Sequence, residues 1–101
     1  MHPFINLECS DFIEASNYVV KDAKGLAALT QWWDTSSLSA IFDFTKPAAR
    51  KWWNTRIANL HINYAFDGFK FDAGETNWLP DAADFKYELF YDSWTISTGF
   101  C

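Results

Sequence analysis

The sequence has little glycine, proline, cysteine or histidine. Its 101 residues include four Gly, three Pro, two Cys and two His. No apolar run approaches the roughly 18–20 residues that cross a bilayer, so we expect no membrane segment in this chain. The start, Met-His-Pro-Phe-Ile-Asn, lacks the basic region and the apolar core of a signal peptide. These absences exclude a membrane-spanning chain and leave the protein's location open.

Positive charge is also scarce. Eight Lys and Arg stand against 13 Asp and Glu, a formal net charge of −5, so the basic surface of a nucleic-acid-binding protein is missing. Cys9 and Cys101 lie near opposite ends without metal-ligand spacing, and we expect two free thiols. His2 and His61 each lack a second ligand at suitable spacing, so we predict no metal and no cofactor.

Aromatic side chains, in contrast, are abundant. The chain has six Trp, ten Phe and four Tyr, which excludes a disordered tail because disordered segments are poor in such residues. The length fits one small domain. A core of about 100 residues has little room for so many Trp, so each Trp must either fill the core or line a site. No repeat or linker divides the chain.

Three segments predict β-structure. Two short apolar runs joined by the polar residues 22–25 predict a β-hairpin over residues 18–30. Residues 40–44 are an apolar run broken by one acid and predict a strand. Residues 69–72 alternate apolar and charged side chains with the period of a strand. The tail after Asp84 fits either a helix or a strand.

Between the last two segments, the periodicity predicts a helix of about 16–18 residues. We expect Thr45 to cap it, and Pro47 suits the first turn because its missing amide hydrogen would be unpaired there anyway. The apolar residues that share one stripe of this helix are Ala49, Trp53, Ile57, Leu60 and Tyr64. We assign Trp52 and Trp53 to the core.

Strand, helix and strand within about 33 residues predict a βαβ unit with parallel strands. Alternation then sends one set of residues to the face away from the helix: Ile41, Asp43, Lys70 and Asp72. A second helix layer over that face would bury these charges at high cost. In a barrel, the C-terminal ends of the strands point into the mouth, where barrel enzymes keep their chemistry. The alternative is a solvated face or a simple salt bridge between Lys70 and Asp72.

Two segments carry a resemblance to glycoside hydrolase family 31. One is Phe-Asp-Gly-Phe-Lys-Phe-Asp-Ala-Gly-Glu (residues 66–75), which resembles that family's nucleophile strand. The other is Ala-Ile-Phe-Asp-Phe-Thr-Lys-Pro-Ala-Ala-Arg-Lys-Trp-Trp (residues 40–53), which is similar to the stretch leading into it. His-Pro-Phe-Ile-Asn (residues 2–6) resembles the branch of the α-xylosidases and the myogenesis-regulating glycosidase. The resemblance covers about residues 2–84. It implies an α/β fold, part of a (β/α)8 TIM barrel with about three strands, one crossover helix and a β-hairpin insertion.

The resemblance also implies a function, the hydrolysis of α-linked sugars with retention of configuration through a glycosyl-enzyme intermediate. Asp72 matches the catalytic nucleophile, and Lys70 matches a residue that contacts substrate hydroxyls. Glu75 would hold the nucleophile loop. Trp33 matches a wall of the sugar subsite, and Asp43 stands at the end of the neighbouring strand. The implied substrate is an α-linked oligosaccharide or glycoside.

The sequence departs from the family pattern at two places. Lys46 stands where members commonly have Asn, and two residues are added between Trp33 and Asp43, so the choice of Trp33 over Trp32 is a judgement. Trp78 fits a site wall and a loop anchor equally well.

The second catalytic carboxyl is not in a matching motif. Asp81, Asp84 and Asp92 have the right residue type only. A barrel takes about 200–250 residues, so we expect a fragment that needs the remainder of its barrel, shows no turnover alone and tends to aggregate through its bare sheet edges. The alternative function is a non-catalytic carbohydrate-binding or structural remnant of such a barrel. Relatives in the branch are often lumenal or secreted, and this resemblance is the only indication of where the protein is located.

Overall fold

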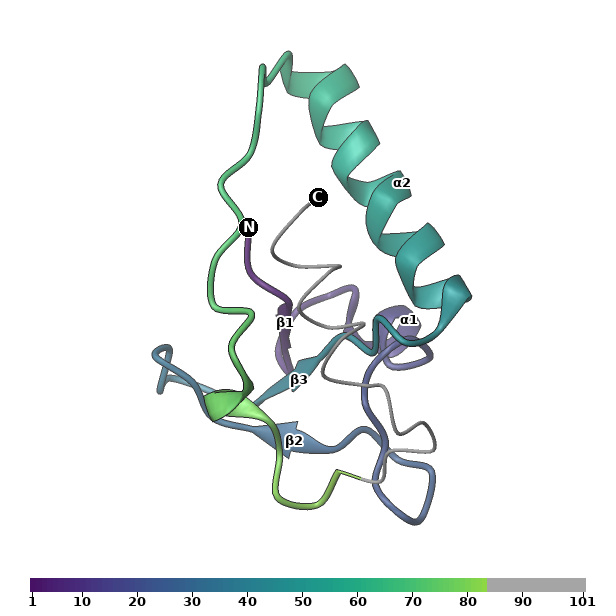
Figure 1. Cartoon of the computed structure of the whole chain (residues 1–101), viewed down its shortest axis with the longest axis vertical. Coiled ribbons are helices and arrows are strands. Elements are labelled where there is room, and N and C mark those ends of the chain that lie inside the picture. Colours follow the sequence, from purple (N-terminus) through teal and green to yellow (C-terminus); the bar gives the residue numbers. More distant parts are fainter. Residues whose placement is uncertain (84–101) are drawn as a thin grey trace.

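The computed structural model describes residues 1–83, which form a small sheet beside one long helix (Figure 1). The elements in chain order are β1 (Phe4–Asn6), α1 (Phe12–Ala15), β2 (Leu29–Thr30), β3 (Ser39–Ile41), α2 (Pro47–Tyr64) and the 3-10 turn η1 (Thr76–Trp78). Our expectations for the C-terminal tail, Asp84, Asp92 and Cys101 lie outside the described residues. A mixed α/β architecture is therefore observed.

The sheet has β3 at its centre, in the order β1-β3-β2. Both pairs are antiparallel, with Phe4 opposite Ile41 and Leu29 opposite Ala40. The prediction that residues 40–44 pair in parallel with residues 69–72 is therefore wrong. Both edges of β3 are already occupied by β1 and β2. Strand β1 has only three residues, which is too short for the alternation of side chains to reveal a strand in the sequence.

Residues 69–72 form no strand, contrary to the prediction, and instead lie along the N-terminal segment (Figure 1). The backbone nitrogen of Met1 donates to the carbonyl oxygen of Lys70 at 2.6 Å. The amide of Asp72 donates back to the carbonyl oxygen of Met1 at 2.9 Å. Met1 is thus hydrogen-bonded to the residues on both sides of Phe71, which is the pattern of a parallel strand pair. The parallel neighbour of residues 69–72 is thus the N-terminus, and α2 lies in the connection between them.

The predicted hairpin is confirmed at its turn. Lys21 pairs with Ala27 in an antiparallel bridge, and the Asp22 carboxylate accepts the amides of Lys24 and Leu26 at 2.9 and 3.0 Å. Gly25 has φ +81°, a conformation that a glycine adopts without steric penalty. The arms on either side form isolated bridges and the short strand β2 rather than two long strands.

The predicted helix is confirmed as α2, which has 18 residues and Pro47 in its first turn. Its N-cap is Lys46, which makes no side-chain capping hydrogen bond. The prediction that Thr45 caps the helix is wrong. Its hydroxyl donates to the carboxylate of Asp43 at 2.5 Å instead, because a nearby charged acceptor competes successfully for a short polar side chain.

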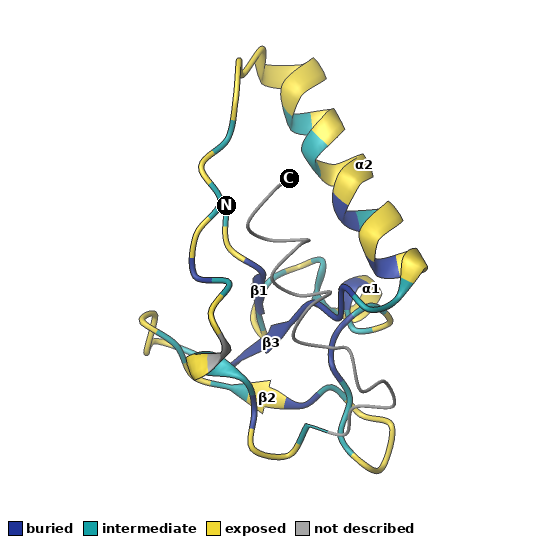
Figure 2. Ribbon diagram, in the orientation of Figure 1, coloured by how far each residue is buried: buried dark blue, intermediate teal, exposed yellow. Residues whose placement is uncertain are grey.

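The predicted apolar stripe of α2 is buried only in its first half (Figure 2). Trp53 is 7 % exposed, and its ring lies edge-on to Phe42 and Phe44, with each centroid 5.3 Å away. Trp52 stacks on Phe42 at 5.2 Å. The assignment of Trp53 to the core is confirmed, whereas Trp52 is partly buried and packs against the core. Tyr64 is 67 % exposed because the C-terminal half of α2 extends away from the sheet (Figure 1).

Candidate functional site

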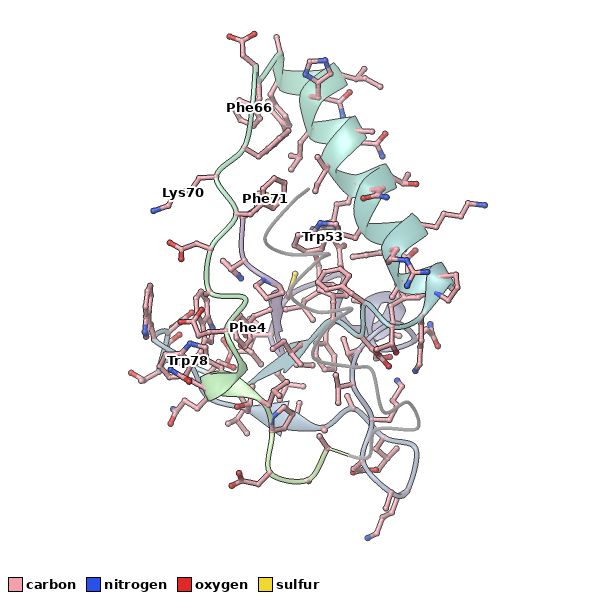
Figure 3. All side chains as sticks on the ribbon, viewed as in Figure 1. Phe4, Trp53, Phe66, Lys70, Phe71 and Trp78 are labelled. Atoms are coloured by element: carbon pink, nitrogen blue, oxygen red, sulfur yellow. The ribbon has the colours of Figure 1, made fainter. Side chains whose placement is uncertain are left out.

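The segment before Asp72 alternates as the sequence predicts. Phe71 lines a small cavity together with Phe44 and Trp53, so its ring faces α2. Lys70 points to the opposite side (Figure 3) and its side chain is 83 % exposed. Asp72 lies two residues after Lys70, so in an extended segment its side chain points to the same outer side. That side chain is half exposed. The exposed face of this segment therefore carries a cation and an anion side by side.

The carboxylate of Asp72 is held in its ionised form. Oδ1 accepts the amide of Ala73 at 2.8 Å, and Oδ2 lies 3.2 Å from Nζ of Lys70. The hydrogen bond from Ala73 is the largest cause that lowers the pKa of Asp72, followed by the hydrogen bond and the positive charge of Lys70. Both effects favour the charged form. Asp72 is thus an accessible and ionised carboxylate.

The residue after Asp72 has an uncommon backbone conformation. Ala73 has φ +59°, in the left-handed region, and is only 3 % exposed. The left-handed region is uncommon for a residue with a side chain, and such conformations concentrate at functional sites. Its amide donates to the carboxylate of the preceding residue, Asp72. An uncommon backbone conformation therefore lies directly next to the candidate carboxylate.

Glu75 and Trp78 anchor the loop that follows. The indole Nε1 of Trp78 donates to Oε1 of Glu75 at 3.1 Å. The ring of Trp78 meets Trp33 edge-on, with centroids 6.2 Å apart and planes at 84°. Trp78 is therefore a loop anchor that also stands against Trp33. The structure brings together two indoles that lie far apart in the sequence.

Trp33 presents the exposed face of an aromatic cluster. Trp32 stacks on Phe4 at 4.6 Å with planes at 9°, and Trp33 lies parallel beyond it at 6.2 Å. Trp33 is 64 % exposed, whereas Trp32 is partly buried. An indole that is accessible on one side and packed against others on the rest can act as a fixed wall for a ligand.

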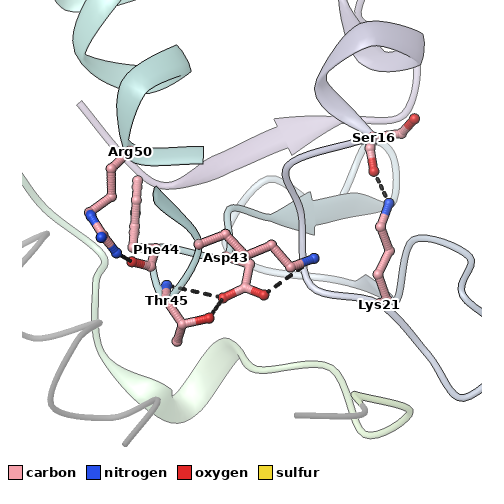
Figure 4. Close-up of polar contacts among 7 residues, drawn as sticks. Ser16, Lys21, Asp43, Phe44, Thr45 and Arg50 are labelled. Carbon is pink, nitrogen blue, oxygen red and sulfur yellow. Dashed lines mark hydrogen bonds and ion pairs between the residues drawn. The ribbon is translucent and has the colours of Figure 1, made fainter. Parts of the chain in front are cut away.

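Asp43 lies elsewhere, at the start of α2 (Figure 4). It is 8 % exposed. Its Oδ1 accepts the amide of Thr45 at 3.1 Å, and its Oδ2 lies 3.6 Å from Nζ of Lys46. Beside it, Arg50 donates to the carbonyl oxygen of Phe44 at 2.6 Å. These contacts fix the turn into the helix and do not join Asp43 to the carboxylate of Asp72 in the described part of the chain. A substrate-binding role for Asp43 stays a prediction.

His2 is a residue that sequence reasoning set aside once a metal site was rejected. Its ring lies 4.3 Å from Trp32, and it lines the same small cavity as Phe71 and Asp72. Loss of solvent around the ring is the largest cause that lowers the pKa of His2. Only the resemblance of residues 2–6 to a family segment pointed to this position.

The described part of the chain offers few residues for a metal site, a membrane span or a reactive thiol pair. Among residues 1–83, no three His, Cys, Asp or Glu side chains are grouped so as to hold a metal ion. Neither described helix has the length and apolar character that a membrane span requires. Cys9 is a free thiol. Asp81 is exposed on the loop after η1, and among residues 1–83 no hydrogen bond or ion pair joins it to Asp72.

Comparison with known proteins identifies the family of this chain. The family described as "Glycosyl hydrolases family 31 TIM-barrel domain" matches residues 1–94. The chain is 39 % identical over 83 residues to the myogenesis-regulating glycosidase of Mus musculus, and this match covers 79 % of this chain and 11 % of that protein. It is 37 % identical over 70 residues to the isomaltosyltransferase of Sporosarcina globispora, covering 66 % of this chain and 6 % of that protein. The chain thus spans a small part of the length of these relatives, and it belongs to glycosyl hydrolase family 31.

Proposed function

We propose that this chain carries the nucleophile of a retaining α-glycosidase, and that Asp72 is that nucleophile. The observation that carries the proposal is the setting of the Asp72 carboxylate. It is half exposed, while the amide of Ala73 and the charge of Lys70 lower its pKa. A carboxylate that attacks carbon must be both reachable and ionised.

The reaction takes two displacement steps. In the first, a carboxylate oxygen of Asp72 bonds to the anomeric carbon while the glycosidic C–O bond breaks, and the departing oxygen takes a proton from a second carboxylic acid. In the second, that group, now a carboxylate, takes a proton from water as the water oxygen bonds to the same carbon. The ester bond between Asp72 and the sugar breaks in the same displacement, which releases the Asp72 carboxylate. Two inversions at one carbon retain the α-configuration.

Lys70 has a second task in this scheme. An ammonium group has three N–H donors, and the ion pair with Asp72 at 3.2 Å uses one of them. The remaining donors are free to bind substrate hydroxyls next to the nucleophile. Lys70 therefore both lowers the pKa of Asp72 and contacts the sugar.

The aromatic residues supply the apolar side of the site. The C–H faces of a pyranose pack well on an indole ring, and Trp33 offers such a ring with 64 % of its surface exposed. Glu75 holds Trp78 at 3.1 Å, and Trp78 in turn stands edge-on to Trp33. The loop that carries Glu75 thereby fixes the wall relative to the nucleophile.

The activity belongs to a complete barrel, of which residues 1–101 supply one part and no second domain. The parallel pattern of hydrogen bonds between Met1 and the two neighbours of Phe71 supports this view, since α2 lies in the connection as in a βαβ unit. The acid/base group, about 5–5.5 Å from the nucleophile in retaining enzymes, comes from another part of the barrel. The relatives' names, a glycosidase and an isomaltosyltransferase, both concern glycosidic bonds.

The test is covalent trapping in the complete protein. A 5-fluoro-α-glycosyl fluoride slows both steps by destabilising the oxocarbenium-like transition state, while its fluoride leaves without acid assistance. We expect the gluco, galacto or xylo reagent to label Asp72, as seen by peptide mass spectrometry. Asp72→Asn should abolish labelling and the exposed control Asp67→Asn should keep it. Labelling of another carboxylate contradicts the assignment, and sugar binding with no labelling favours the carbohydrate-binding remnant.

A further inference from the structure

The connection between α2 and the segment that leads to Asp72 is an exposed turn. It lies at the end of α2 that extends away from the sheet (Figures 1 and 2). Asp67 and Gly68 are both exposed, and the rings of Phe66 and Phe69 on either side of them meet edge-on, with centroids 5.9 Å apart. Exposed turns are the parts of a folded chain whose backbone is most open to chemical attack.

The two groups of this turn that can react with each other are not held by the described part of the chain. There, the backbone amide of Gly68 donates to no group, and the carboxylate of Asp67 has neither a hydrogen bond nor an ion pair. Asp22 is different, because its carboxylate accepts the amides of Lys24 and Leu26 at 2.9 and 3.0 Å. The side chain of Asp67 is therefore free to turn toward the amide nitrogen of the next residue.

Gly68 leaves this approach open. No heavy atom lies within 4 Å of the place that a Cβ on Gly68 would take, and glycine has no side chain to shield its amide. The pair Asp81–Ala82 offers a comparison in the same chain, since both of its residues are exposed but the Cβ of Ala82 restricts the backbone around the amide. Of the two pairs, Asp67–Gly68 is the less hindered.

We propose that Asp67 is a site of spontaneous isoaspartate formation. The amide nitrogen of Gly68 bonds to the side-chain carboxyl carbon of Asp67, and the carboxyl OH and the amide hydrogen leave as water, which closes a succinimide ring. Water then opens the ring. Attack at the backbone carbonyl carbon breaks its bond to nitrogen and leaves isoaspartate, whereas attack at the side-chain carbonyl carbon restores aspartate. This chemistry needs only water and is independent of the proposed function.

The product changes the backbone just ahead of the candidate carboxylate. In isoaspartate the chain continues through the side-chain methylene group, so the backbone gains one carbon and the α-carbon bears a free carboxylate. Met1 holds the segment that follows through Lys70 and Asp72, with hydrogen bonds of 2.6 and 2.9 Å. The added length therefore enters between α2 and this contact. The free α-carboxylate is the group that isoaspartate methyltransferases methylate with S-adenosylmethionine.

The test follows the entry of oxygen from solvent. The complete protein is incubated at neutral pH in water enriched in the heavy oxygen isotope, digested with trypsin in ordinary water and analysed by mass spectrometry with fragmentation. Each ring opening leaves one heavy oxygen on the residue, and the peptide of residues 57–70 has Asp67 as its one acidic residue. We expect heavy oxygen to accumulate at Asp67 several-fold faster than at Asp81. An isoaspartate methyltransferase with radiolabelled S-adenosylmethionine should methylate the same peptide.

Two variants of the turn isolate the chemistry. Asp67→Asn releases ammonia in place of water in the same attack and should react faster than the wild type. Gly68→Ala fits the open space around that residue and should slow the entry of heavy oxygen several-fold. Far-UV circular dichroism checks that each variant folds.

The outcomes decide the proposal without reference to glycosidase activity. Heavy oxygen that enters Asp67 no faster than Asp81, or at an unchanged rate in Gly68→Ala, overturns it. Entry of heavy oxygen without methylation also overturns it, because the ring then opens only to aspartate. No reaction in either the wild type or Asp67→Asn shows that the complete protein shields the turn, and the proposal fails. The nucleophile assignment depends on the separate trapping of Asp72 and is unaffected by any of these results.

Discussion

Two alanines have the same backbone conformation in different surroundings. Ala65 ends α2 with φ 54°, and it is exposed. Ala73 follows Asp72 with φ 59°, and it is 3 % exposed. A left-handed conformation costs a residue with a side chain roughly 1–2 kcal/mol, and glycine avoids that cost. Replacing each alanine by glycine therefore compares the backbone strain next to Asp72 with a reference position in the same chain.

The expected magnitudes follow from three contributions. Relief of the left-handed conformation adds about 1–2 kcal/mol to the free energy of unfolding, and the greater freedom of glycine in the unfolded chain subtracts about 0.4–1 kcal/mol. We expect Ala65→Gly to stabilise by about 0.5–1 kcal/mol. Ala73→Gly also loses a buried methyl group, worth about 0.8 kcal/mol, so its net effect is close to zero.

The assay is urea unfolding of the complete protein, followed by tryptophan fluorescence and far-UV circular dichroism. Ala58→Gly, at an exposed position in the middle of α2, is the control and should destabilise by about 1 kcal/mol. A loss of stability in Ala65→Gly would refute the left-handed assignment. An equal gain in Ala65→Gly and Ala73→Gly would show that the methyl group of Ala73 contributes no packing.

Three further predictions concern the site and the core. Lys70→Met removes the charge that helps to lower the pKa of Asp72, so the carboxylate takes up its proton at a higher pH; the acid limb of the labelling rate should move to higher pH, and the exposed control Lys51→Met should not move it. Trp53→Ala should lower the free energy of unfolding by about 3–5 kcal/mol, measured in urea. Trp33→Ala should change stability by less than about 1 kcal/mol, because the ring is largely exposed, and should weaken a fluorescence titration with methyl α-D-glucopyranoside; unchanged binding counts against the aromatic wall.

The elements that the sequence predicts well are those with local causes. The length of α2 follows from apolar spacing and from Pro47, both of which act within a few residues. The hairpin turn follows from Asp22 and Gly25, whose hydrogen bonds and backbone conformation are also local. Sheet pairing is different. The alternation of residues 40–44 suits a parallel or an antiparallel partner equally. The partners are β2 and β1, and β1 lies far away in the sequence.

The same distinction explains Asp43. Its position at the end of an apolar run suggests the mouth of a barrel, but alternation along a strand ignores the hydrogen bonds that a short carboxylate makes with residues just ahead of it. The amide and the hydroxyl of Thr45 and the ammonium group of Lys46 bind it first. Lys70 and Asp72 also interact locally, and the ion pair that the sequence suggested for them is present at 3.2 Å.

The N-terminal segment determines which groups from distant parts of the sequence lie near Asp72. Two backbone hydrogen bonds join Met1 to Lys70 and Asp72, so the residue after Met1 must lie beside the carboxylate whatever its side chain. That residue is His2, and β1 begins two residues later with Phe4, on which Trp32 stacks. The register of this parallel contact therefore brings the segment that carries His2 and Phe4 alongside residues 70–72. A shift of that register would change which residues lie beside Asp72 without changing the sequence motif around it. The motif can therefore be found in the sequence, whereas the residues that surround it in space cannot.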